Sequence, residues 1–144
     1  LSSESKLKIR AMLREVTEIE SIGDSCYNLA RTINHKYRGN EDFTEKQYSH
    51  IHQMFQLTDD ALNQMVSLVE DEGHQVDVNK SFNLENEINN YRSQLKNQNV
   101  LDVNNKEYDY QMGVHYMDLI GECEKLGDYI VNVVEARTDM KEKK

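Results

Sequence analysis

Proline is absent from the 144 residues of this chain, and glycine occurs only six times. These two residue types form most β-turns, and folds built from many short strands need frequent turns. Their scarcity argues against a strand-rich fold. Helices are therefore expected over most of the chain, which is long enough for one domain with its own core.

Cysteine is also scarce, with Cys26 and Cys123 as the only two. They are too far apart in the sequence for a zinc-type Cys-x-x-Cys pair, and they form no disulfide framework. Free cysteines of this kind are typical of reducing compartments, and they behave as small apolar residues. We therefore predict that both lie in the core and that the domain lies on the cytoplasmic side.

Basic residues are outnumbered, 17 against 26 acidic residues, which gives a net charge of -9. Nucleic-acid binding needs Lys and Arg clustered on one face, so no nucleic-acid partner is expected. There is also no apolar run of about 18 residues, so this segment is predicted to be soluble and not to span a membrane. Because the chain starts at Leu1 without Met, we interpret it as a segment of a larger protein, such as a membrane protein.

Four stretches carry apolar residues at spacings of three and four, the pattern of amphipathic helices. They cover about residues 3–37, 42–72, 79–97 and 106–137. Short connections make consecutive helices antiparallel. The pattern predicts an all-α fold, a single domain over residues 1–144 built as an up-down-up-down four-helix bundle.

The apolar stripes of the first and last stretches, like those of the other two, predict core-facing sides. The stripe of the first stretch comprises Ile9, Met12, Val16, Ile19, Gly23, Cys26, Ala30 and Ile33. The stripe of the last stretch comprises Met112, Tyr116, Leu119, Cys123, Leu126, Ile130 and Val133. Such spacing favours shallow crossing angles of about 20°.

Local signals predict where these helices begin and end. The sequence Arg38-Gly39-Asn40 can adopt the left-handed geometry that ends a helix. Either Asp42 or Thr44 can cap the second helix, and Gly73 ends it. The polar stretch 97–105 is predicted to be a loop.

A short motif occurs twice, at residues 20–24 with Asn28 four residues later, and at residues 124–128 with Asn132 four residues later. Both copies have Glu, Gly, Asp and Asn at the same positions. Residues four apart share a helix face, so Glu and Asp within each copy can point at a common spot. Carboxylates suit cations such as Mg²⁺, Ca²⁺, Mn²⁺ or iron. Each copy is a candidate metal clamp, and a shared site requires the first and last helices to lie side by side.

The same spacing also fits acids on a solvated helix flank, paired with Arg31 or Lys125. Exposed ion pairs of this kind contribute about 0–1 kcal/mol. On this interpretation the glycines allow close helix contact, which offsets their cost of about 1 kcal/mol relative to alanine. The residues alone leave both interpretations open.

The two motifs resemble the Glu-Arg-Ile-Gly-Asp motif of the PhoU family, the helical regulators of bacterial phosphate uptake. Residues 21–33 and 84–95 resemble the PhoU-like tail of bacterial sodium/phosphate cotransporter family proteins, and residues 85–89 correspond to a Glu-x-x-Ile-Asp motif. The resemblance implies a PhoU-like bundle that tunes phosphate transport and whose acidic motifs hold iron or zinc clusters. The implied metal ligands are Glu20, Asp24, Glu85, Glu124 and Asp128.

This sequence departs from the family pattern at three positions. Ser21 and Lys125 replace the motif arginine, and Asn89 replaces an acid, which weakens the implied metal site. The chain also holds one three-helix unit with a single preceding helix, whereas a free-standing PhoU protein has two full repeats. A complete pair of clusters is therefore not expected.

The resemblance implies a regulatory partner, either the transmembrane phosphate transporter portion of the same chain or a signalling protein, and leaves a homo-oligomer and direct phosphate binding open. A metal-free helical sensor or adaptor domain is the alternative. A carboxylate-bridged metal oxidase would need Glu-x-x-His motifs on two helices, and the nearest match is Asp71-x-x-His74. No catalytic residue is therefore predicted. We expect His50 and His52 at the surface, and Tyr108, Tyr110 and Tyr116 in packing roles.

Overall fold

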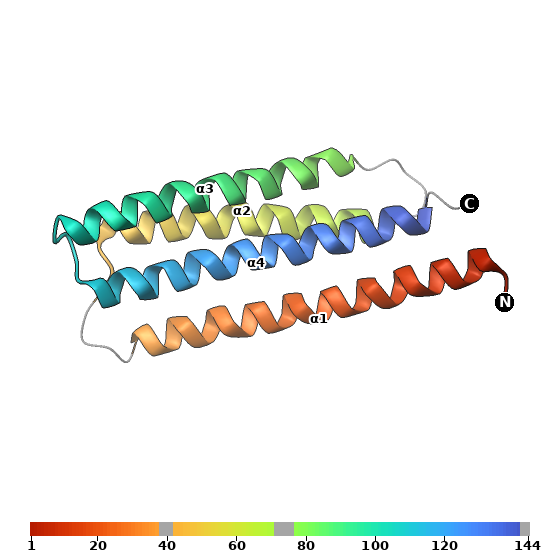
Figure 1. The fold of residues 1–144 in the computed structure, drawn as a ribbon, viewed down its shortest axis with the longest axis horizontal. Coiled ribbons are helices and arrows are strands. Elements are labelled where there is room, and N and C mark those ends of the chain that lie inside the picture. The colour runs from red at the N-terminus through yellow and green to blue at the C-terminus, as the bar shows by residue number, and fades with distance from the viewer. Residues whose placement is uncertain (38–41, 71–76, 142–144) are drawn as a thin grey trace.

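The computed structural model describes residues 1–37, 42–70 and 77–141. These residues contain no strand and form four helices, α1 (Ser3–Tyr37), α2 (Glu45–Glu70), α3 (Val78–Asn104) and α4 (Tyr110–Lys141). Consecutive helices run in opposite directions (Figure 1). The predicted all-α, up-down-up-down bundle is confirmed.

Helix α4 is the centre of the bundle. Within the described part of the chain, α2, α3 and α4 contact one another, whereas α1 contacts α4 and neither of the other two helices. Figure 1 shows α1 as the outermost helix on the α4 side. The molecule is therefore a three-helix unit with a fourth helix laid along one side of it.

The predicted apolar stripe of α4 forms the core. All seven of its residues are buried, and most are almost inaccessible to water. They pack against the inner faces of α2 and α3, where Met54 and Ile88 are fully buried. Burying a side chain of this size contributes roughly 1.5–3 kcal/mol. This stripe explains why α4 contacts both α2 and α3.

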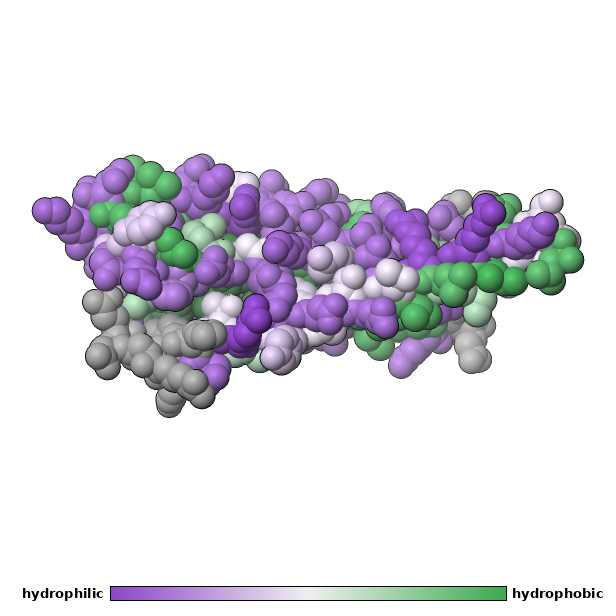
Figure 2. Space-filling model, turned by 60° about the horizontal axis from the view of Figure 1, so that its bottom comes forward, coloured by the Kyte–Doolittle hydropathy of each residue, from purple (hydrophilic) through white to green (hydrophobic). Residues whose placement is uncertain are grey.

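The predicted core stripe of α1 is wrong, because the structure leaves it in water. We call these eight residues the free seam, namely Ile9, Met12, Val16, Ile19, Gly23, Cys26, Ala30 and Ile33; all eight are exposed. The side of α1 that packs on α4, the α4-facing seam, comprises Lys8, Ala11, Glu15, Glu18, Ile22, Ser25, Leu29 and Thr32. In Figure 2, which brings α1 forward, hydrophobic residues gather at the right-hand end, where the N-terminal half of α1 lies.

The two seams have the same spacing and differ by one position along the helix, which is about 100° of rotation. Periodicity alone cannot choose between them, and the more apolar seam was the natural prediction. The structure uses the more polar seam because the facing positions of α4 carry polar partners for it, described below. For the same reason Cys26, predicted to be buried, is exposed, whereas Cys123 is buried as predicted.

Side-chain caps mark the starts of α2 and α4. Thr44 and Gln47 form a capping box, in which the backbone N–H of Gln47 donates to Thr44 Oγ1 at 3.1 Å and the backbone N–H of Thr44 donates to Gln47 Oε1 at 3.0 Å. Asp109 caps α4 by accepting a backbone hydrogen bond at 2.8 Å from the residue three positions later. The predicted breaks at Arg38-Gly39-Asn40 and Gly73 lie outside the described residues.

The predicted loop over residues 97–105 is wrong, because α3 continues to Asn104. The polar residues there serve tertiary contacts: Asp102 is buried, and Gln98, one turn earlier, donates a hydrogen bond to it. The helix ends two residues later, where Lys106 adopts a left-handed φ of 60°. Low helix propensity and high polarity were therefore overridden by packing.

Candidate functional site

The acidic pair predicted on α1 points away from α4. Glu20 and Asp24 are both exposed. The α4-facing residue Ile22 is two positions from each of them, and two positions on a helix correspond to about 200° of rotation. Their carboxylates therefore lie on the solvent side of α1.

The acidic pair predicted on α4 faces α3 instead. Glu124 forms an ion pair with Arg92 at 3.6 Å. Asp128 lies close enough to Glu85 to raise the pKa of that carboxyl, so the structure brings these two predicted residues together. Burial, and then the hydrogen bond and charge of Asp128, raise the pKa of Glu85 to about 7, while a hydrogen bond with Asn89 acts in the opposite direction.

These placements do not assemble a multinuclear metal cluster. Across residues 1–37, 42–70 and 77–141, no group of three or more His, Cys, Asp or Glu is arranged to hold a metal ion. The two acidic pairs belong to different faces, and a guanidinium already neutralises Glu124. Glu85 and Asp128 form the largest group of predicted metal ligands that lie close together in the structure.

The two motif glycines have different surroundings. At Gly127 an added Cβ would lie 3.4 Å from Ile88 Cδ1, in van der Waals contact with α3. At Gly23 an added Cβ would meet nothing within 4 Å. Close helix contact, proposed above for both glycines, therefore holds for Gly127 and not for Gly23.

The repeated motif builds the α1–α4 interface through residues that the sequence comparison missed. Asn132 Nδ2 donates to Glu18 Oε2 at 3.2 Å, and reciprocally Asn28 Nδ2 lies 3.4 Å from Glu122 Oε1. Ser25 Oγ also donates to Glu122 Oε1, at 2.8 Å. Extending the aligned motifs by two residues toward the N-terminus would have matched Glu18 with Glu122. The motif thus encodes an approximate two-fold relation between two antiparallel helices.

Charged pairs extend this interface toward the N-terminus of α1. Glu15 is buried and accepts a hydrogen bond from Arg137 Nη2 at 2.8 Å. Arg14 Nη2 lies 3.0 Å from Glu135 Oε2 in a more exposed pair. Because desolvation of charges offsets much of their attraction, such an interface holds α1 less firmly than an apolar one of equal area.

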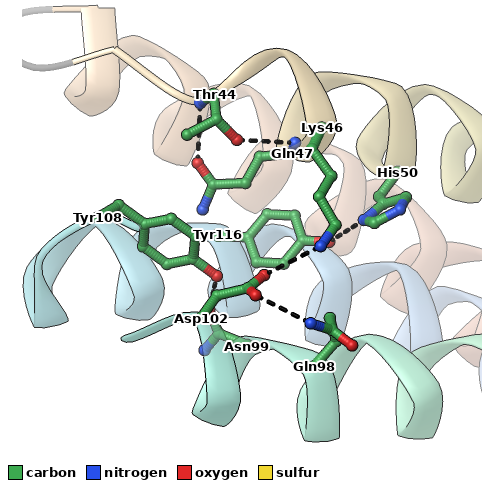
Figure 3. Close-up of polar contacts among 9 residues, drawn as sticks. All are labelled: Thr44, Lys46, Gln47, His50, Gln98, Asn99, Asp102, Tyr108 and Tyr116. Carbon is green, nitrogen blue, oxygen red and sulfur yellow. Dashed lines mark hydrogen bonds and ion pairs between the residues drawn. The ribbon is translucent and has the colours of Figure 1, made fainter. Parts of the chain in front are cut away.

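A second polar cluster lies at the end of the bundle where α3 leads into α4 (Figure 3). The carboxylate of buried Asp102 lies 3.6 Å from Lys46 Nζ of α2 and accepts a hydrogen bond of 2.9 Å from Gln98 Nε2. The Tyr108 hydroxyl donates to Asn99 Oδ1 at 2.6 Å. These contacts connect α2, α3 and the segment before α4.

His50 and Tyr116 form the inner part of this cluster, with His50 Nδ1 3.1 Å from the Tyr116 hydroxyl. Burial raises the pKa of Tyr116 and, with nearby Lys46, lowers that of His50. Both groups are therefore neutral at physiological pH. His50 is partly buried, contrary to prediction, whereas His52 is exposed as predicted.

Two of the three tyrosines predicted to have packing roles do have them. Tyr116 is buried and Tyr108 is partly buried, as predicted, but Tyr110 is 75 % exposed and the prediction for it is wrong. Because Tyr116 is inaccessible to a substrate, its contact with His50 serves the packing of the helices. These residues are scattered over the sequence, and no local pattern could have grouped them.

Comparison with models of known protein families matches residues 51–136 to the PhoU domain. The match covers most of α2, all of α3 and most of α4, and α1 lies before it. No curated protein and no solved structure matches the chain. None of the helices in the described residues combines the length and the apolar character that a membrane span needs.

Proposed function

Because the chain belongs to the PhoU domain family, we propose that it is a regulatory domain that modulates phosphate transport through contacts with another protein. The observation that carries this proposal is that the family match coincides with the three mutually packed helices α2, α3 and α4. The family has a regulatory role in phosphate homeostasis. Accordingly, no residue of the chain is proposed to perform catalysis.

The proposed partner is the transmembrane portion of a sodium/phosphate cotransporter family protein in the same chain, at the cytoplasmic side of the inner membrane. This part of the proposal rests on the resemblance of residues 21–33 and 84–95 to the tails of those proteins. A separate signalling protein is the other partner that a PhoU domain would suit. A metal-free sensor or adaptor domain remains the alternative function, and a loss of phosphate control on deletion would distinguish the two.

Phosphate uptake by cells that carry the native gene tests the proposal. Leu119→Lys places a charge in the core and should unfold the domain, whereas Asp118→Lys adds the same side chain at an exposed position. We expect the first variant to change the rate of phosphate uptake as a deletion confined to this domain does, and the second to leave it unchanged. Sulfate uptake provides the specificity control. Unchanged phosphate uptake in the Leu119→Lys strain, with the phosphate-starvation response also unaltered, would refute the proposal.

Metal binding is a narrower part of the proposal. A divalent cation such as iron or zinc would take the place of the proton between Glu85 and Asp128, since two facing carboxyls repel each other when both are ionised. Metal analysis of the purified protein tests this part. Asp128→Asn should lower the metal content, and Asp24→Asn, at an exposed position of α1, should not. Equal metal content in all three proteins would exclude a site at this pair.

A further inference from the structure

The free seam of α1 has the pattern of a coiled-coil contact. Its eight residues alternate at spacings of three and four over four heptads, which is the repeat by which helices pair in a left-handed supercoil. The structure places the more polar seam against α4 and exposes the more apolar one. A helix normally buries its most apolar stripe, so the free seam has the character of a surface that packs against another helix.

The order of large and small residues along the free seam indicates which helix would pack against it. Folding the seam about its midpoint, at the level of Ser21, places residues opposite each other in the pairs Ile9–Ile33, Met12–Ala30, Val16–Cys26 and Ile19–Gly23. In three of the four layers a large side chain faces a small one, and the outer layer pairs two isoleucines. We infer that α1 pairs with α1 of a second copy of this chain in an antiparallel, two-fold symmetric dimer.

A parallel, in-register pair would pack much less well. It would place Gly23, Cys26 and Ala30 each against its own copy, and three consecutive layers of small residues leave voids. The antiparallel pair fills the same space, since each small residue receives a larger side chain. Alternation of large and small side chains across an interface is the arrangement that fills a helix contact.

Residues beside the free seam fit the same arrangement. Leu13 and Tyr27 lie on the flank away from α4 and are 63 % and 67 % exposed. In the antiparallel pair Leu13 of one copy lies within about one helical turn of the level of Tyr27 of the other, so each covers the other. Glu20 lies near the two-fold axis and approaches its own copy, so the dimer is weaker at low salt than at high salt.

The exposed area is sufficient for a dimer. The seven large apolar residues of the free seam and its flank are between 43 and 67 % exposed; they are Ile9, Met12, Leu13, Val16, Ile19, Tyr27 and Ile33. They extend over about 40 Å of helix at 1.5 Å per residue. Together they present an area of the order of the roughly 800 Å² per partner of a stable interface. The inference does not depend on the proposed role in phosphate transport.

The molar mass in solution tests the dimer, with sedimentation equilibrium on the whole 144-residue chain as the measurement. We expect twice the chain mass of 16.9 kDa. Val16→Asp should weaken self-association at least about 10-fold, because it buries an unpaired charge in the dimer, while Val66→Asp at an exposed position of α2 should leave it unchanged. Circular dichroism confirms that both variants are helical. A monomeric wild-type chain, or equal effects of the two substitutions, would overturn the inference.

Crosslinking tests the direction of the pairing. Val16→Cys places a thiol opposite Cys26 of the other copy, so a short bismaleimide should link the two copies, whereas Cys123 is buried and should not react. Adding Cys26→Ser to this variant should abolish the product. The wild-type chain should give no product, since its two Cys26 residues lie far apart in an antiparallel pair. A crosslinked wild-type dimer, which requires a parallel pair, or no product from Val16→Cys would overturn the antiparallel arrangement.

Glu20 gives a variant that should strengthen the dimer. Glu20→Gln removes the like-charge approach at the two-fold axis, so self-association should tighten roughly twofold at low salt and little at high salt. The matched control is Glu45→Gln, at an exposed position of the first turn of α2, which should have no effect. An unchanged dissociation constant for Glu20→Gln at low salt would contradict the proposed register.

Discussion

Alanine at Gly113 should destabilise the fold, whereas alanine at Gly121 on the same helix should stabilise it. At Gly113 an added Cβ would lie 2.9 Å from Val103 Cγ2 and 3.2 Å from Asn99 Oδ1. At Gly121 it would meet nothing within 4 Å. Both changes remove the same backbone freedom from α4, so the difference between them isolates the packing of α3 against α4.

The magnitudes follow from two opposing effects. Replacing a helical glycine by alanine gains about 1 kcal/mol at either position. At Gly113 the overlap costs about 2 kcal/mol, because Val103 is β-branched and cannot rotate freely away. Asn99 must also move, and it accepts the hydrogen bond of Tyr108, whose loss costs about 1 kcal/mol. The expected result is a gain of about 1 kcal/mol for Gly121→Ala and a loss of about 2 kcal/mol for Gly113→Ala.

Urea unfolding followed by circular dichroism measures both values. For a domain of this size, 1 kcal/mol corresponds to roughly 3–4 °C in Tm, so the two variants should melt about 10 °C apart. Combining Gly113→Ala with Val103→Ala should recover part of the loss, since it removes the atom in closest approach. If Gly113→Ala proves as stable as Gly121→Ala, the two helices are not as close at this level as the structure has them.

Three further predictions address the caps and charged groups. Because burial and Asp128 raise the pKa of Glu85 to about 7 in the folded state, its contribution to stability is fully present below about pH 4.5 and is lost as the pH rises through 7. Allowing for solvent screening, Glu85→Gln should raise the free energy of unfolding by about 1 kcal/mol at pH 8 and hardly change it at pH 4.5, and equal effects at both pH values would contradict this. Thr44→Ala should lower the free energy of unfolding by about 1 kcal/mol through loss of the α2 cap, and Thr44→Ser should retain most of it. Glu15→Ala should lower the free energy of unfolding by about 2 kcal/mol, because it leaves the guanidinium of Arg137 without its partner. If the losses from Glu15→Ala and Arg137→Ala simply add in a double-mutant cycle, the two residues are not coupled.

The helices and the inner face of the three-helix unit were predictable because they follow from local pattern. The α4 stripe from Met112 to Val133 keeps a spacing of three and four over its whole length, and all seven of its residues are buried as the pattern predicts. Thr44 as a cap follows from the geometry of its own turn. In contrast, the end of α3 was placed too early, because the burial of Asp102 depends on Lys46 of another helix and leaves no local signal.

The candidate site, too, could be predicted from the sequence only in part. The repeated motif was visible in the sequence, and the two helices that carry it, α1 and α4, contact each other. Its chemistry was not visible, because the meeting of Glu85 with Asp128 and the orientation of Glu20 toward solvent depend on how each helix is rotated. Rotation about a helix axis is set by the neighbouring helices.

The sequence by itself therefore determined the number and the alternating direction of the helices, since the absence of proline and the spacing of apolar residues act within each segment. Only the tertiary structure decided which side of α1 faces α4. Two seams one position apart compete for that contact, and the polar groups of α4, Glu122, Asn132 and Arg137, pair with the more polar one. The apolar seam is exposed because hydrogen bonding across the interface, and not hydrophobicity along the helix, sets the rotation of α1.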